Sequence, residues 1–190
     1  MKINSILKIK ANYTAFNINP IIKKTDDIMK VVKELSHKYT NLEDLLSDKI
    51  YKYLIEEGVI LNAKMQHNLI PTSGFKVLCM ILTGDTTYTG EMNYWALGSG
   101  TTAFSASSTK LNTEVGRGEI DSTSYSDNIA YADSFIEAGD IADATYQEFA
   151  IFIDGGAGAD TGQAWSLLIT GGWVKSGSLY VAGQYTFANA

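Results

Sequence analysis

Glycine is distributed very unevenly along this chain of 190 residues, and its distribution restricts the folds open to the chain. Sixteen of the 17 glycines follow Pro71, and the exception is Gly58. Because glycine weakens helix interiors and favours turns, the part after Pro71 predicts short strands joined by tight turns. The part before it is rich in Lys, Leu and Ile and has the periodicity of helices. We therefore expect two units: residues 1–67, an N-terminal arm with a helical oligomerisation or anchoring segment, and residues 68–190, a β domain.

The helical segment contains an apolar stripe with a spacing of 4, 3, 4, 3 and 4 residues, which is typical of a left-handed coiled coil. The stripe consists of Ile28, Val32, Leu35, Tyr39, Leu42 and Leu46. The segment is one helix with a stutter or two helices broken at Thr40, where Glu43 completes a capping box. The stripe either bundles helices of several chains, with a trimer favoured because Tyr39 needs room, or packs on its own domain.

The rest of the chain predicts an extended arm or edge strand over residues 1–22, and a short helix that follows Pro71 and ends at Gly84. Alternation is clearest near the C-terminus, where Leu179, Val181, Tyr185 and Phe187 fall on one face. The predicted strands after the short helix cover residues 92–98, 124–138, 145–154, 163–170 and 178–187. The fold class we expect is α+β, with the helical, coiled-coil segment followed by an antiparallel, jelly-roll-like β-sandwich.

The glycine turn at residues 98–100 is a candidate phosphate loop, but a P-loop needs a Lys and a Ser or Thr directly after its glycines. Here Thr101 and Thr102 follow, and the nearest lysine is Lys110. We therefore expect this turn only to reverse the chain. Both histidines, His37 and His67, precede the β domain, so a Ser–His–Asp site inside that domain is excluded. We expect His37 to lie at an exposed helix position.

The acids of the β domain leave glycoside hydrolysis open, since that reaction needs only two suitably spaced carboxylates. Nothing in the sequence marks such a pair, and we interpret the acids as solvated surface groups. The segment from Asp154 to Asp160 has the oxygen ligands for calcium but no EF-hand spacing, which favours a plain loop. The sequence thus predicts no catalytic residue, no cofactor and no metal site. The acids concerned are Glu114, Glu119, Asp121, Asp133, Glu137, Asp140, Asp143, Glu148, Asp154 and Asp160.

Charge narrows the class of partner. Residues 1–70 carry 11 lysines and eight acids, whereas residues 71–190 carry three lysines, one arginine and 13 acids. Phosphate contacts dominate nucleic-acid affinity, so we expect no nucleic acid to bind. The chain has no apolar run of membrane-spanning length and no signal-peptide pattern, and we expect synthesis in the host cytoplasm without membrane insertion. The single cysteine, Cys79, is expected to be buried.

Tryptophan offers one candidate recognition site. Trp95 lies in an apolar strand and is expected in the core, while Trp173 follows two glycines. An indole that projects from such a turn suits surface recognition, including contact with a host glycan. The alternative is that Trp173 packs inside the domain.

Two series of short motifs cover residues 68–187. The first is an Asn, a Gly-led helix, a strand ending in "ALG-G-TT" and then "L--E--R". The second is a Glu-led strand, a loop, another strand and "G--L-V---Y-F". The first occupies Asn68, Gly74, Ala96, Leu97, Gly98, Gly100, Thr101, Thr102, Leu111, Glu114 and Arg117, and the second Glu148, Ile151, Phe152, Gly177, Leu179, Val181, Tyr185 and Phe187. In this order the motifs resemble structural proteins of tailed phages and related viruses.

The resemblance implies a virion component: a tail, tail-fibre, head-fibre or spike protein that is not an enzyme. Its partners would be other virion proteins and further copies of itself. Two alternatives remain at this point, a module that binds a carbohydrate or host receptor and a capsid decoration protein docked through its N-terminal segment. Glu114 and Arg117 stand three apart, and we expect them either to pair on one helical turn or to be solvated separately.

Overall fold

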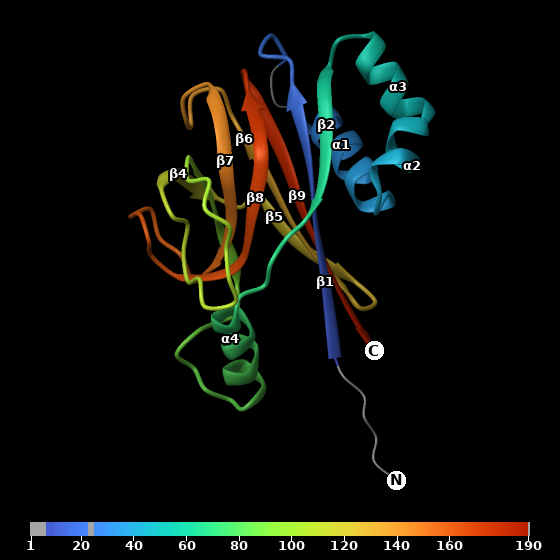
Figure 1. Ribbon diagram of the computed structural model, residues 1–190. Helices are drawn as coiled ribbons and strands as arrows, with labels where there is room; N and C mark the ends of the chain where they lie inside the picture. Colours follow the sequence, from blue (N-terminus) through green and yellow to red (C-terminus); the bar gives the residue numbers. More distant parts are fainter. Residues whose placement is uncertain (1–6, 23–24, 190) are drawn as a thin grey trace.

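The computed structural model describes residues 7–22 and 25–189, which form two antiparallel sheets and four short helices (Figure 1). The strands are β1 (Leu7–Ile18), β2 (Ile60–His67), β3 (Met92–Gly98), β4 (Glu114–Glu119), β5 (Ser122–Ser126), β6 (Ile129–Ile136), β7 (Ala144–Ile153), β8 (Gln163–Lys175) and β9 (Ser178–Asn189). The helices are α1 (Asp26–Lys38), α2 (Leu42–Ser47), α3 (Lys49–Glu56) and α4 (Thr72–Leu82).

The two sheets pack face to face around the main core. One sheet has the strand order β2-β1-β9-β6-β5 and the other β4-β3-β7-β8. Large aromatic residues from both inner faces fill the space between them, as expected for packed sheets. The core includes Tyr13 and Tyr185 from the larger sheet and Trp95, Phe149 and Trp173 from the smaller one. Trp95 is therefore a core residue, as predicted.

The first strand corrects the predicted fold class and its domain boundary. The α+β prediction, with a long helical, coiled-coil segment at the N-terminus, is wrong: the chain is mostly antiparallel β, and its helices are short. β1 lies between β2 and β9 in the larger sheet, so it is not an edge strand. The expected boundary at residues 67 and 68 divides this sheet, because β1 and β2 precede it and β9 follows it. The first residues of the predicted arm, 1–6, lie outside the described residues.

The apolar stripe of the predicted coiled coil packs on the chain's own sheet. Val32 and Leu35 are buried beneath α1, against Phe16, Phe135 and Tyr180 on the outer face of the larger sheet. Of the other positions, Ile28, Tyr39 and Leu42 are partly buried against the same cluster, and Leu46 is 43% exposed. The alternative of packing within one molecule is therefore correct, and no continuous seam faces a second chain.

Local capping residues explain why three short helices replace one long one. Each of these helices begins with a residue whose side-chain oxygen accepts a hydrogen bond from backbone N–H groups of the first turn. The capping residues are Thr25 for α1, Asn41 for α2 and Asp48 for α3. Tyr39 ends α1 and donates its hydroxyl to the Asp48 carboxylate. This hydrogen bond lowers the pKa of the Asp48 carboxyl, although its partial burial acts in the opposite direction. The break lies around Thr40 as one alternative predicted, but the cap is Asn41.

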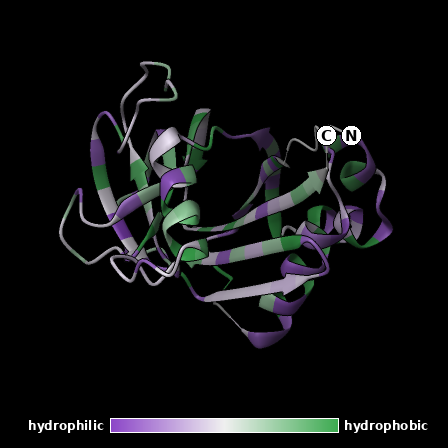
Figure 2. Ribbon diagram, turned by 90° about the horizontal axis from the view of Figure 1, so that it is seen from below, coloured by the Kyte–Doolittle hydropathy of each residue, from purple (hydrophilic) through white to green (hydrophobic). Residues whose placement is uncertain are grey.

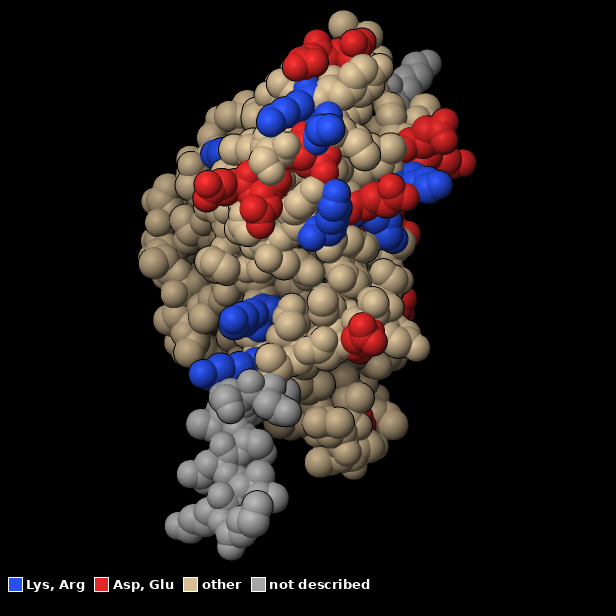
Figure 3. Space-filling view, turned by 90° about the vertical axis from the view of Figure 1, so that its right-hand side faces the viewer, with Lys and Arg blue, Asp and Glu red and all other residues tan. Residues whose placement is uncertain are grey.

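Lysines and acids alternate on the side of the molecule that carries α1, α2 and α3 (Figure 3). Lys38 pairs with Asp48 there at 3.0 Å. A surface of mixed sign does not create the extended positive field that attracts nucleic acid.

The predicted helix after Pro71 is confirmed as α4, which covers one end of the two sheets. The segment before it is held by two backbone hydrogen bonds between Leu69 and Leu167 of β8. Gly74 then approaches β8 so closely that a Cβ atom would lie 2.8 Å from the Trp165 carbonyl oxygen. Only this face of α4 is packed, so Cys79 is exposed, and the prediction that its thiol is buried is wrong.

We expect Leu35→Ala to lower the free energy of unfolding by about 2–5 kcal/mol, because the substitution leaves a cavity between α1 and the sheet. Leu46→Ala is the matched control and should change it by about 1 kcal/mol or less, since Leu46 is largely solvated. Urea titration of the two variants measures both values. Equal losses would contradict the packing of this stripe on its own sheet.

Candidate functional site

A buried carboxylate joins α1 to the larger sheet. Asp133 of β6 is fully buried and accepts hydrogen bonds from His37 Nε2 at 2.8 Å and from the Tyr180 hydroxyl at 2.7 Å. Lys33 Nζ lies 3.0 Å from its second oxygen. His37 also stacks on Tyr131, with ring centroids 3.9 Å apart. The prediction of an exposed His37 is therefore wrong, because its imidazole packs between Asp133 and Tyr131 of the larger sheet.

Electrostatics hold this cluster together. Burial by itself would raise the pKa of the Asp133 carboxyl, but the hydrogen bonds from His37, Tyr180 and Lys33 and the charge of His37 outweigh it and lower the pKa. Burial and the neighbouring carboxylate raise the pKa of the Tyr180 phenol well above its usual value. The Asp133 carboxylate is thus an ionised acceptor near neutral pH.

A histidine that donates to a buried carboxylate also occurs in nucleophilic triads, where a serine completes the site. Ser36 donates to the Lys33 carbonyl at 2.8 Å and lies 3.4 Å from the Tyr180 hydroxyl. Ser122 accepts from Lys33 Nζ at 3.0 Å and contacts Asp133. Neither serine of this cluster makes the contact with His37 that a triad requires. What the arrangement does is fasten α1 to β6 and β9.

A second buried carboxylate explains the glycine turn at residues 98–100. Glu148 of β7 is fully buried and accepts from the backbone N–H groups of Gly100, Asn112 and Thr113 and from the Asn112 side chain. A Cβ atom on Gly98 or Gly100 would lie 2.5 or 2.6 Å from its oxygens. These glycines therefore do more than reverse the chain: they leave room for the carboxylate that holds the loop between β3 and β4.

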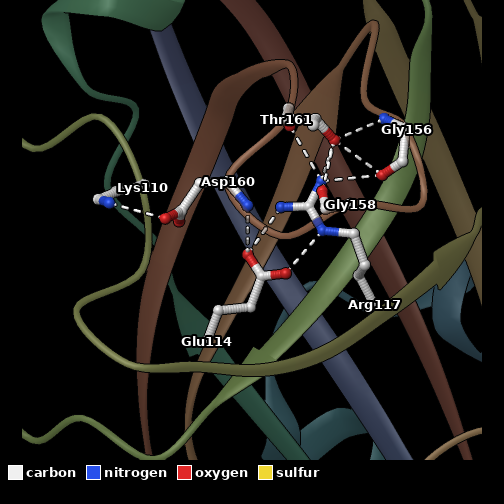
Figure 4. A network of polar contacts seen from close by, with 7 residues as sticks. All are labelled: Lys110, Glu114, Arg117, Gly156, Gly158, Asp160 and Thr161. Atoms are coloured by element: carbon white, nitrogen blue, oxygen red, sulfur yellow. Dashed lines mark hydrogen bonds and ion pairs between the residues drawn. The ribbon is translucent and has the colours of Figure 1, made fainter.

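Glu114 and Arg117 form a further clamp on the outer face of the smaller sheet (Figure 4). Arg117 Nε and Nη2 donate to the two Glu114 oxygens at 2.6 and 2.7 Å, and both side chains are about 95% buried (3% and 5% exposed). The pair lies on strand β4, so the expected helical turn is wrong. Arg117 Nη1 also donates to the carbonyls of Gly156 and Thr161, and its guanidinium lies 4.5 Å from the Phe152 ring centroid.

The loop from Asp154 to Asp160 is fixed by these contacts. Thr161 Oγ1 donates within the loop to Gly156 and Gly158, and Asp160 pairs with Lys110 at 2.7 Å. Asp154 accepts from the Thr89 backbone N–H at 2.6 Å. The two carboxylates considered as calcium ligands are therefore engaged with protein donors. Among the described residues, no group of three or more His, Cys, Asp or Glu side chains is arranged to hold a metal ion.

An acid-lined hollow of about 380 Å³ lies where β3, β4 and β5 meet. Its acids are Glu91, Glu119 and Asp121. Glu119 accepts from the Tyr94 hydroxyl at 3.2 Å, and Asp121 accepts from the Phe135 backbone N–H at 2.6 Å. These two acids are exposed as well as hydrogen-bonded, in keeping with the expected surface position. The expectation of a solvated acid is wrong for Asp133, Glu148 and Glu114, whose side chains are buried.

Trp173 is buried, which removes the basis for surface recognition by its indole. The ring lies in the main core with its centroid 5.3 Å from that of Phe149. Its Nε1 donates to Gln66 Oε1 of β2 at 2.7 Å. Lys64 adds a second link, from its Nζ to the Gly172 carbonyl at 2.6 Å. The two glycines before Trp173 have φ angles of +60° and +88°, and the turn they make points the indole inward.

The most distinctive surface is the apolar end formed by α4, which Figure 2 views directly. Phe75, Ile81 and Leu82 are exposed there, and Leu82 is 76% exposed. Beside them opens an apolar pocket of about 160 Å³. Its lining comes from α4, the strand ends and one glycine: Leu78, Ile81, Gly90, Met92, Ala130, Ile153, Trp165 and Phe187. We define these exposed residues and the pocket as the α4 surface.

Comparisons of the chain with protein-family models, with curated proteins and with solved structures gave no match. Within residues 7–22 and 25–189, no helix has both the length and the apolar character needed to cross a membrane.

Sequence reasoning missed the α4 surface and the Asp133 cluster for different reasons. In α4 the signal was present, since Phe75, Ile81 and Leu82 leave the helix apolar on more than one side. Asp133 is 96 residues from His37, and no local pattern connects the two.

We expect Gly100→Ala to lower the free energy of unfolding by about 1–3 kcal/mol, because the new Cβ would displace the Glu148 carboxylate from its backbone donors. Gly139→Ala is the control, since a Cβ at Gly139 meets no atom within 4 Å. Chemical unfolding of both variants measures the difference. A neutral Gly100→Ala would show that the carboxylate does not hold this loop.

The Asp133 cluster predicts a dependence of stability on pH. Because the folded-state pKa of Asp133 lies below its usual value of 3.8, its contribution is complete above about pH 4 and is lost as the pH falls through the folded pKa. In Asp133→Asn the free energy of unfolding should be lower at neutral pH and should fall less steeply in acid. The exposed turn residue Asp127, changed to Asn, is the control for removing one charge. If the free energy of unfolding fell with the same slope in acid for wild type and Asp133→Asn, this linkage would be contradicted.

Proposed function

We propose that this chain is a structural subunit of a virus particle that acts through protein–protein contacts and has no catalytic role. The α4 surface carries this proposal. A contiguous exposed apolar surface on a globular protein usually marks an interaction site. Here Leu82 and Phe75 stand beside an apolar pocket at one end of the molecule, where a neighbouring subunit has free access.

The buried clamps support the same role. Glu148, Glu114 and Arg117 fix the two long loops of the smaller sheet through charge-assisted hydrogen bonds. Loops fixed in this way present a constant surface to neighbours, which suits a repeated contact in an assembly. The motif order that resembles phage structural proteins points in the same direction.

The structure bears differently on the two alternative functions, binding of a host glycan and decoration of a capsid. Recognition of a host glycan by Trp173 has lost its basis, because the indole is in the core. A decoration protein docked through its N-terminal segment is favoured by one observation: Leu46 and Ile50, and Tyr53 at 58% exposure, present apolar surface on α2 and α3. Assembly by a trimeric coiled coil is not proposed, because its stripe faces the sheet.

The test is whether the chain is found in particles, and through which surface it is held. Mass spectrometry of particles purified by density gradient from cells that carry the gene should detect the chain at a fixed ratio to the major particle protein. Its absence from purified particles would overturn the proposal.

Two charge substitutions separate the two docking surfaces. Leu82→Asp should abolish incorporation into particles while leaving the free energy of unfolding unchanged, because Leu82 is solvated. Tyr53→Asp should leave incorporation intact. The reverse result would favour docking through α2 and α3, and incorporation of both variants would contradict a role for either surface.

A further inference from the structure

The pocket of the α4 surface has the size and lining of a socket for one aromatic side chain. Its volume is about 160 Å³, and an engineered apolar cavity of about 150 Å³ is known to bind benzene. Apart from Gly90, every residue that lines it contributes an apolar side chain, from α4 on one side and from β3, β6, β7, β8 and β9 on the other. The pocket therefore suits a ring rather than a charged group.

One residue of the pocket lining carries a buried polar group that has no partner among the described residues. Trp165 lines the pocket and is 5% exposed, and its Nε1–H is buried without a hydrogen-bond partner among the described residues. A buried indole N–H normally donates to an oxygen, and leaving it unpaired costs free energy. Because this nitrogen is itself buried, an occupant of the pocket meets the apolar atoms of the lining rather than the N–H, and an aromatic ring is the group that fits them.

The chain itself presents such a group beside the pocket. Tyr125 of β5 is 84% exposed, the highest value among the large apolar side chains of the described residues together with Ile21. It pairs directly with Ala130 of β6, which lines the pocket. Residues directly opposite each other on antiparallel strands share a face, so the Tyr125 side chain leaves the sheet on the pocket side.

β5 is also an accessible edge. It is the last strand of the larger sheet, its residues Ser122–Ser126 carry no charge or proline, and its pairing with β6 contains no bulge. Natural edge strands commonly use those features to repel other chains. The approach of another molecule to Tyr125 is therefore not blocked by the strand that carries it.

From this juxtaposition we propose that the occupant of the pocket is Tyr125 of a second copy of this chain, in a two-fold symmetric dimer. A two-fold contact brings the same patch of both molecules together. Because Tyr125 and the pocket are neighbours within one patch, each copy inserts its phenol into the pocket of the other. The rings of both copies thereby leave water.

The inference rests on the proposed assembly role, since it names the neighbour that the α4 surface contacts. Each copy carries a net charge of −6, so the copies repel each other at long range, and added salt screens this repulsion. The dimer should therefore become tighter as the salt concentration rises from about 0.05 M to about 0.3 M.

Sedimentation velocity of the full chain at tens of micromolar tests the proposal. We expect a dimer for wild type and a dissociation constant raised about tenfold or more in Tyr125→Ser, which removes the inserted ring. Tyr125→Phe keeps the ring that fills the apolar pocket and should dimerise like wild type. Tyr53→Ser is the matched control, an exposed tyrosine on α3 away from the pocket, and should dimerise like wild type.

A mixing experiment distinguishes reciprocal insertion from general stickiness. Ala130→Leu narrows the pocket but keeps Tyr125, and Tyr125→Ser keeps the pocket but lacks the ring. In a homodimer of either variant, no Tyr125 ring can enter an open pocket. In a heterodimer of the two variants, one Tyr125 ring enters one open pocket. We therefore expect the mixture to associate more tightly than either variant alone.

A monomeric wild type at these concentrations, or a Tyr125→Ser variant that dimerises like wild type, would overturn the inference. So would a mixture that associates no better than its components. Those outcomes leave the particle test above unaffected, because a different virion protein can occupy the α4 surface. Unfolding curves of all variants confirm that each is folded, which is expected because Tyr125 is solvated and Ala130 lies at the pocket wall.

Discussion

β1 and β9 pair along their whole length, from Leu7 with Asn189 to Ile18 with Ser178, and the other elements depend on this pairing. The two strands form the middle of the larger sheet, with β2 paired to β1 on one side and β6 paired to β9 on the other. Their inner faces supply Tyr13 and Tyr185, whose hydroxyls are 2.8 Å apart in the core. Their outer faces supply Phe16 and Tyr180, on which α1 packs. The first and last strands of the chain thus together carry both the main core and the packing of α1.

Buried polar groups then attach the irregular parts of the chain to this framework. Asp133 fastens α1 to the larger sheet, Glu148 holds the loop between β3 and β4, and Arg117 with Glu114 holds the loop between β7 and β8. A buried charge is tolerated only where it is paired and hydrogen-bonded, and each of these groups is. At the α4 end the opposite holds, because the apolar side chains of Phe75, Ile81 and Leu82 are left in water. That contrast is why the α4 surface is proposed as the contact with other proteins.

Local sequence patterns were reliable where one face of an element is buried along its length. The alternation of Leu179, Val181 and Tyr185 correctly placed β9 and its inner face, and the turn signals around α4 correctly gave a short helix. The stripe from Ile28 to Leu46 was misread because its spacing is the same for a helix that packs on a partner chain and for one that packs on its own sheet. β1 was misplaced because its partner, β9, lies at the other end of the chain.

The sequence by itself determined the kinds of local structure: where glycines permit turns, where apolar residues alternate, and where caps such as Asn41 and Asp48 end one helix and begin the next. It did not determine how Glu114 meets Arg117, because a spacing of three brings side chains together on a helix and these two lie on strand β4. Only the tertiary structure decided what each side chain faces. Whether Trp173 meets solvent or Phe149, and whether Asp133 meets water or His37, depends on contacts between residues far apart in the chain. Such contacts form when sheets and helices pack, and no local period encodes them.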